Sequence, residues 1–169
     1  PLDFLNFKLT GRAATDLSMA SGTMLYNIHT QDWDDDLLQF SGISVDKLPE
    51  VIPAGTTVGN LLPLMANELG LSENVTVVMG GQDQKLAAIG AGIGEDICTV
   101  SIGTATAITK LNPGNHSASP LFAFDKGRLF AETSIATTGA VMGWLSRILG
   151  ISLKEMDSLA EKAPKGSGG

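Results

Sequence analysis

The stretch Val75-Thr76-Val77-Val78-Met79-Gly80-Gly81-Gln82-Asp83-Gln84 decides the fold class of this chain. Its first five residues form an apolar β-forming run, and two glycines end it, which predicts a short strand over 75–79. The Ala-rich segment after it predicts a helix over 84–90. Strand, glycine turn and helix in this order indicate an α/β protein. An acid at the end of such a strand lies where open α/β sheets bind ligands.

The polar residues of this turn are candidates for chemistry. The Asp83 carboxylate could accept a proton from a substrate hydroxyl, and Gln82 and Gln84 could hydrogen-bond neighbouring hydroxyls. The alternative is structural, because Asp directly before a helix is a common N-cap, and the pattern alone favours that interpretation. Both can hold, since a capping Asp can still face a cleft.

The segments before this turn are expected to be mainly helical. The sequence predicts helices over 2–9, from an N-cap at Asp16 to 24, over 33–40 and over 60–69, with an extended connector over 48–53. The segments after the glycine-rich stretch 90–94 change character. Here the sequence predicts strands over 97–102, 104–111, 121–125 and 128–133, a turn over 112–115, and helices over 139–149 and 152–162. We therefore expect one domain over 1–93 and a second one beginning at 94.

Two further motifs follow the expected domain boundary. Gly103 and Thr104 lie between two predicted strands, where backbone amides and a hydroxyl could meet a phosphate. Gly139 begins a predicted helix, where it could lie beside a nucleotide. An ordinary hairpin and a simple helix start are the structural alternatives, and the pattern alone favours them. The chain has no Gly-Lys-Ser or Gly-Lys-Thr phosphate loop.

Composition excludes several classes of protein. Hydrophobic residues make up 43% and charged residues 17% of the 169 residues, which predicts a folded chain. The net charge of −7 offers no electrostatic surface for nucleic acid or an anionic membrane, so neither is an expected partner. Cys98 is the single cysteine, and we expect it to be a small core residue in a cytoplasmic protein. His29 and His116 have no clustered partners, so no metal site is predicted.

Several phrases together resemble the FGGY carbohydrate kinases, the family of xylulose, ribulose, gluconate and glycerol kinases. They occur in the family's order over almost the whole chain: Lys8-Leu9-Thr10-Gly11, Asp16-Leu17-Ser18-Met19-Ala20-Ser21, Met24-Leu25-Tyr26-Asn27, Asp32-Trp33-Asp34-Asp35 and Leu48-Pro49-Glu50-Val51. The resemblance implies an actin-like, ribonuclease-H-like ATPase fold, in which this chain is an internal piece spanning the junction of the two domains. Residues 1–93 would end the substrate domain and 94–169 would begin the nucleotide domain.

The resemblance also implies roles for single residues. Asp83 corresponds to the catalytic base and Gln84 to a substrate contact, with Gln82 beside them. Gly103 and Thr104 correspond to the loop that meets the ATP phosphates, and Gly139 to the glycine beside the nucleotide. ATP and Mg²⁺ are the implied cofactors, with the magnesium carboxylate outside this chain. The implied partners are a small sugar or polyol and a second copy of the protein in a homodimer.

The substrate-facing block departs from the glycerol kinases. Those enzymes usually have Gly-Thr-Gly where this chain has Gly103-Thr104-Ala105, and Gly-Gly-Gln-Asp-Gln is closer to the ketose kinases. A ketopentose such as xylulose is therefore the expected acceptor. Three alternatives stay open: a glycerol or other polyol kinase, another ATPase of the same fold, and a non-catalytic sugar- or nucleotide-binding module. The family's Asp-x-Gly-Thr phosphate loop has no counterpart here, so we expect the chain alone to be inactive.

Overall fold

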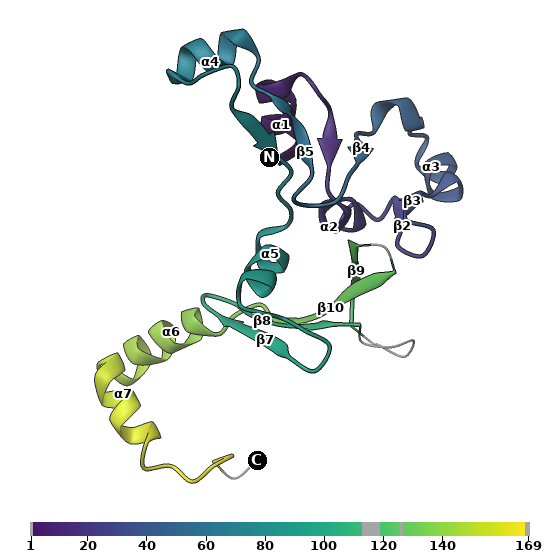
Figure 1. Cartoon of the computed structure of the whole chain (residues 1–169). Coiled ribbons are helices and arrows are strands. Elements are labelled where there is room, and N and C mark those ends of the chain that lie inside the picture. Colours follow the sequence, from purple (N-terminus) through teal and green to yellow (C-terminus); the bar gives the residue numbers. More distant parts are fainter. Residues whose placement is uncertain (1, 113–118, 126, 168–169) are drawn as a thin grey trace. The chain divides into compact units, whose positions relative to one another are not determined.

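A computed structural model of the chain describes residues 2–112, 119–125 and 127–167 (Figure 1). The chain divides into two compact units. Unit 1 comprises Pro1–Thr99 and Thr109–Thr133, and unit 2 comprises Val100–Ile108 and Ser134–Gly169. Among the described residues, no helix combines the length and the apolar character that crossing a membrane requires.

Unit 1 alternates short helices with short strands. Its helices are α1 (Leu2–Thr10), α2 (Leu17–Ser21), α3 (Asp35–Ser41), η1 (Val45–Lys47), α4 (Pro63–Leu69) and α5 (Asp83–Gly90). Its strands up to that point are β1 (Ala14–Thr15), β2 (Tyr26–Asn27), β3 (Asp32–Trp33), β4 (Glu50–Val51), β5 (Thr57–Asn60) and β6 (Thr76–Val78). β1 pairs with β4 in parallel, whereas β2 with β3 and β5 with β6 are antiparallel.

Two apolar clusters hold unit 1 together. In the first, helix α1 packs on β1, β5 and β6 (Figure 1), and the buried residues are Ala14, Ile52, Val58 and Met79. In the second, α2 packs on β9 (Leu121–Asp125), and the buried residues are Leu17, Ala20, Tyr26 and Ala123. Strand β6 ends at Val78, and the next residue, Met79, is only 2% exposed. The turn that leads to Asp83 therefore starts from a buried residue.

A second sheet has the strand order β7-β8-β10-β9. It is built from β7 (Cys98–Ile102), β8 (Thr106–Leu111), β9 and β10 (Arg128–Ile135). β9 and β10 form the predicted antiparallel hairpin, with Gly127 in the left-handed region at φ +82°. Unit 2 adds α6 (Gly139–Leu149) and α7 (Leu153–Ala160). Helix α7 begins with the predicted capping box of Ser152 and Glu155.

Most of the predicted elements are confirmed with errors at their ends, whereas the short strands β1, β2 and β5 were not predicted. The N-cap of α5 is Gln82, so the interpretation of Asp83 as the cap is wrong, and Asp83 is the first residue of the helix. Helix α4 begins at Pro63 rather than at residue 60, because Asn60 pairs with Thr76 in the β5–β6 ladder. Helix α2 ends at Ser21, short of residue 24.

Two smaller differences concern the single residues Trp33 and Cys98. Trp33, predicted at the start of a helix, belongs to strand β3, and Asp34 caps the helix that follows. Cys98 is exposed on β7, which is a sheet edge in this chain, so the prediction of a core cysteine is wrong. The turn predicted over 112–115 falls mostly outside the described residues.

Candidate active site

Asp83 occupies the first position of α5, directly after the loop that leaves β6. Its side chain is exposed, and Oδ1 accepts a hydrogen bond from the Gln84 backbone N–H at 2.7 Å. The N-terminal turn of a helix favours a negative charge. The carboxylate is therefore held at a helix start with one oxygen oriented by the backbone, while the side chain remains open to solvent.

The loop before Asp83 is anchored by a buried polar pair in α2. The Gln82 backbone N–H donates to the Ser18 hydroxyl oxygen at 3.0 Å. That hydroxyl donates to Asp16 Oδ2 at 2.7 Å, and the Ser18 N–H donates to the same oxygen at 2.9 Å. Asp16 and Ser18 are each only 4% exposed. Successive hydrogen bonds in a low-dielectric interior reinforce one another. This series of hydrogen bonds therefore fixes the backbone next to Asp83.

Gly81 is a glycine for a steric reason. A Cβ placed on it would lie 2.9 Å from Asp16 Oδ2 and 3.2 Å from Ser18 Oγ. Gly80 differs, because a Cβ there would meet only Leu2 and Leu86 methyl carbons at ordinary contact distances of 3.5 and 3.9 Å. At Gly81 the loop thus lies too close to the Asp16–Ser18 pair to accommodate a side chain without a shift.

The two glutamines next to Asp83 differ in their surroundings. Both side chains are partly exposed. The Oε1 atom of Gln82 is buried, and it accepts no hydrogen bond from any residue that the structure describes. Gln82 makes no side-chain capping bond to α5 either. An unpaired buried carbonyl oxygen costs free energy, which a ligand donor would recover.

The candidate nucleotide residues come together within unit 2. The Gly139 N–H donates to the Gly103 carbonyl at 3.0 Å, and the Thr138 N–H donates to the Thr104 carbonyl at 2.8 Å. The Gly103 N–H donates to the Ala105 carbonyl at 2.9 Å. The amides of Gly103 and Gly139 are therefore already used inside the turn. Within the described part of the chain, the Thr104 N–H and hydroxyl have no such bond.

Close packing explains the glycine at position 139 but not the one at 103, where an added Cβ would meet only the Ala105 oxygen, at an ordinary 3.7 Å. A Cβ on Gly139 would lie 2.6 Å from the Gly103 oxygen and 3.2 Å from its carbonyl carbon. Because these are backbone atoms, they cannot move aside as a flexible side chain would. Gly139 therefore allows the start of α6 to lie directly against the β7–β8 turn.

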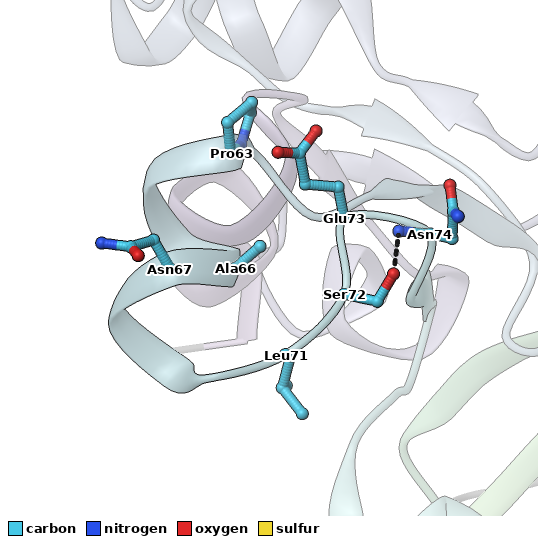
Figure 2. A pocket seen from close by; sticks show the side chains of 7 residues that line it. All are labelled: Pro63, Ala66, Asn67, Leu71, Ser72, Glu73 and Asn74. Carbon is cyan, nitrogen blue, oxygen red and sulfur yellow. Dashed lines mark hydrogen bonds between the residues drawn. The ribbon is translucent and has the colours of Figure 1, made fainter.

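A surface hollow in unit 1 has no part in this arrangement. It has a volume of about 520 Å³ and lies between α4 and the loop before β6 (Figure 2). Its lining residues are Pro63, Ala66, Asn67, Leu71, Ser72, Glu73 and Asn74. The Ser72 hydroxyl accepts from the Asn74 N–H at 3.2 Å, and Figure 2 shows Asn67 on the side of α4 turned away from this loop. None of the predicted site residues lines it.

Sequence reasoning missed two groups of residues around the site. Asp16 was expected only to cap a helix, and Ser18 had no expected role, although the Asp-x-Ser phrase was itself a usable signal. Lys85 was the other omission, and it is 1% exposed on α5. The only feature of the sequence that could have drawn attention to Lys85 is that it is a single lysine inside the Ala-rich stretch 84–90.

Comparison with known proteins identifies the family. Residues 1–90 match the N-terminal domain model of the FGGY family of carbohydrate kinases. The chain belongs to this family. Among its FGGY relatives, xylulose kinase of Bacillus subtilis is 40% identical over 111 residues, covering 64% of this chain and 22% of that protein. Glycerol kinase of an Acidovorax species is 33% identical over 177 residues, covering 98% of this chain and 35% of that protein.

Solved structures confirm the fold class predicted for this FGGY chain. The ligand-bound xylulose kinase of Lactobacillus acidophilus matches 97% of the chain with a TM-score of 0.88 and 26% identity. The match covers 35% of that chain. The mixed α/β architecture is that of the actin-like sugar kinases. The present chain spans about a third or less of the length of these relatives.

Proposed function

We propose that this FGGY chain is part of a kinase that transfers the γ-phosphoryl group of ATP to a hydroxyl of a small sugar, with Asp83 as the general base. The observation that carries the proposal is the placement of Asp83: an exposed carboxylate at the first residue of α5, after a loop that is hydrogen-bonded to the buried Asp16–Ser18 pair. The acceptor that we favour is a ketopentose such as xylulose.

The chemistry needs a positioned base more than a covalent nucleophile. Phosphoryl transfer depends mainly on alignment of the reacting groups and on electrostatic stabilisation. A carboxylate within hydrogen-bond reach of the acceptor hydroxyl takes its proton as attack proceeds. Asp83 supplies such a carboxylate, and the anchored backbone at Gln82 limits its freedom to move away from the acceptor.

Gln82 and Gln84 would bind the acceptor. The buried, unpaired Oε1 of Gln82 fits a sugar hydroxyl as its donor. Gln84 lies next to Asp83 in the first turn of α5 and is partly exposed, so its amide could hydrogen-bond a neighbouring hydroxyl. Both roles are consistent with a polyhydroxylated substrate.

Residues of unit 2 would bind ATP. Thr104 offers an N–H and a hydroxyl that no described residue occupies, which suits a phosphate oxygen. The amides of Gly103 and Gly139 are used within the turn, so these residues would act by shaping it, and Gly139 does so by allowing close backbone packing. Mg²⁺ would accompany ATP, with its carboxylate ligand outside this chain. In this proposal, 1–93 belongs to the substrate domain and 94–169 begins the nucleotide domain, although Thr109–Thr133 of the latter lies in compact unit 1.

Two observations bear on the acceptor. The relative that is 40% identical is a xylulose kinase, whereas the glycerol kinase relative is 33% identical. The Gly-Gly-Gln-Asp-Gln turn also resembles the ketose kinases. Glycerol or another polyol is the second candidate, because the 33% match extends over 98% of the chain.

The test is ADP release by the full-length kinase that contains this chain, measured against a panel of ketoses and polyols. Asp83→Asn keeps the size of the side chain but removes the base, so we expect activity with one sugar to be lost in this variant while ATP binding and the melting temperature are kept. Activity retained in Asp83→Asn would disprove the role of Asp83. ATP binding without ADP release for any acceptor would favour a non-catalytic binding module.

A further inference from the structure

Lys85 is a charged residue in the interior of unit 1. It lies on α5 two residues after Asp83, and it is 1% exposed. Its Nζ donates to Glu132 Oε2 at 2.6 Å and lies 4.0 Å from the centroid of the Phe122 ring. A lysine is almost never fully buried unless it is paired, so this contact calls for an explanation.

The partner of Lys85 belongs to a small network on the sheet. Glu132 lies on β10, and its side chain is 14% exposed. Its Oε2 also accepts from the Thr109 hydroxyl at 3.2 Å, and Thr109 on β8 is 2% exposed. Phe122 lies on β9. Through one side chain, α5 is therefore tied to three neighbouring strands.

Stability alone does not explain this network. Burying two charges costs so much desolvation that apolar side chains of similar size often serve equally well or better. An ion pair instead adds a defined geometry, because a short charge-assisted hydrogen bond fixes the position of both partners. An apolar helix face on a sheet would allow small rotations and shifts that this bond prevents.

The geometry of the helix connects this bond to the candidate base. Two residues along an α-helix are separated by about 200° around its axis. Lys85 points into the unit and is buried, so Asp83 points away from it and is exposed. Any rotation of α5 about its axis would move the Asp83 carboxylate relative to a bound acceptor.

We propose that Lys85 is a positioning residue, and that its ion pair with Glu132 fixes the rotation and axial position of α5 and thereby the location of the Asp83 carboxylate. This inference rests on the proposed role of Asp83. It adds that the rate of phosphoryl transfer depends on a bond inside unit 1 that touches neither substrate.

The test uses Lys85→Met, Glu132→Gln and the double variant in the full-length kinase. Each change removes the ion pair while keeping side-chain size. Because a misplacement of about 1 Å can lower a rate on the order of 100-fold, we expect kcat to fall by about 10-fold to 100-fold with little change in the KM for ATP. The double variant should lose no more activity than the more affected single variant, because both changes break the same bond.

A stability-matched control separates positioning from folding. Val58→Ala removes methyl groups from the first apolar cluster of unit 1, where Val58 is 4% exposed, and it leaves α5 unchanged. All variants are assayed at a temperature at which each is folded. A kcat well below that of Val58→Ala supports the proposal, and a kcat equal to it overturns the proposal. Asp83→Asn in the same assay tests the role of Asp83 as the base separately. The activity of this variant shows whether Asp83 is the base, whether or not Lys85 positions the helix.

Discussion

The Ser18 hydroxyl and the Gln82 backbone N–H, 64 residues apart in the sequence, are joined by a partly buried hydrogen bond of 3.0 Å. Through this bond, helix α2 holds the loop that presents Asp83. The Ser18 hydroxyl is itself oriented by Asp16, to which it donates at 2.7 Å. The Ser18 side chain thus helps to hold the loop from which α5 and the candidate base Asp83 begin, and this relation can be tested.

Ser18→Ala should impair both stability and turnover. The change leaves the partly buried Gln82 N–H without its acceptor, which costs about 1 kcal/mol. Ser21→Ala is the matched control, because the Ser21 hydroxyl on the same helix accepts from the Ala123 N–H at 2.9 Å and does not touch the loop. We expect a similar loss in the free energy of unfolding from both variants, but a lower kcat only from Ser18→Ala. Equal kcat values would contradict the role of Ser18.

Gly81→Ala and Gly80→Ala should differ although the residues are neighbours. A Cβ on Gly81 would lie 2.9 Å from Asp16 Oδ2, whereas a Cβ on Gly80 meets nothing closer than 3.5 Å. Overpacking of this kind costs about 1–3 kcal/mol. Chemical denaturation of the two variants measures the difference, and ADP release should fall only for Gly81→Ala. A Gly81→Ala variant as stable and active as Gly80→Ala would show that the loop can relax.

Local patterns predicted the elements better than they predicted the contacts around Asp83. The glycine turn after Met79 and the capping box of Ser152 depend on residues close in sequence, so they could be recognised directly. The bonds of Ser18 to Gln82 and of Lys85 to Glu132 join segments 64 and 47 residues apart. A single sequence contains no signal for such pairs, and Lys85 in an Ala-rich segment gave no sign of its partner.

Tyr26 should make the stability of unit 1 fall at alkaline pH. Burial raises the pKa of Tyr26 above its ordinary value of 10.0, and Asp32 and Asp16 raise it further. The folded protein therefore holds the phenol proton more tightly than the unfolded chain does. This contribution is fully present below pH 10 and is lost as the pH rises through the higher folded pKa.

Tyr26→Phe isolates that effect, because it keeps the ring and removes the titrating group. We expect the free energy of unfolding of the wild-type protein to fall more steeply than that of the variant once the pH rises above about 10. Denaturant unfolding at several pH values measures both slopes. Parallel curves would mean that the Tyr26 hydroxyl titrates normally in the folded protein.

Gly139→Ala should disturb the proposed nucleotide turn, whereas Gly143→Ala in the same helix should not. A Cβ on Gly139 would lie 2.6 Å from the Gly103 oxygen, but a Cβ on Gly143 meets only the Arg147 Nη1 atom, at 3.8 Å. Alanine is a better helix former than glycine, so Gly143→Ala should stabilise α6 by about 0.5–1 kcal/mol. Gly139→Ala has to displace backbone, and it should move Thr104 with it. In the full-length kinase we therefore expect a higher KM for ATP with Gly139→Ala, an unchanged KM with Gly143→Ala, and little change in the KM for the sugar in either. If Gly139→Ala binds ATP as the wild-type protein does, the turn of Gly103 and Thr104 does not contact the phosphates.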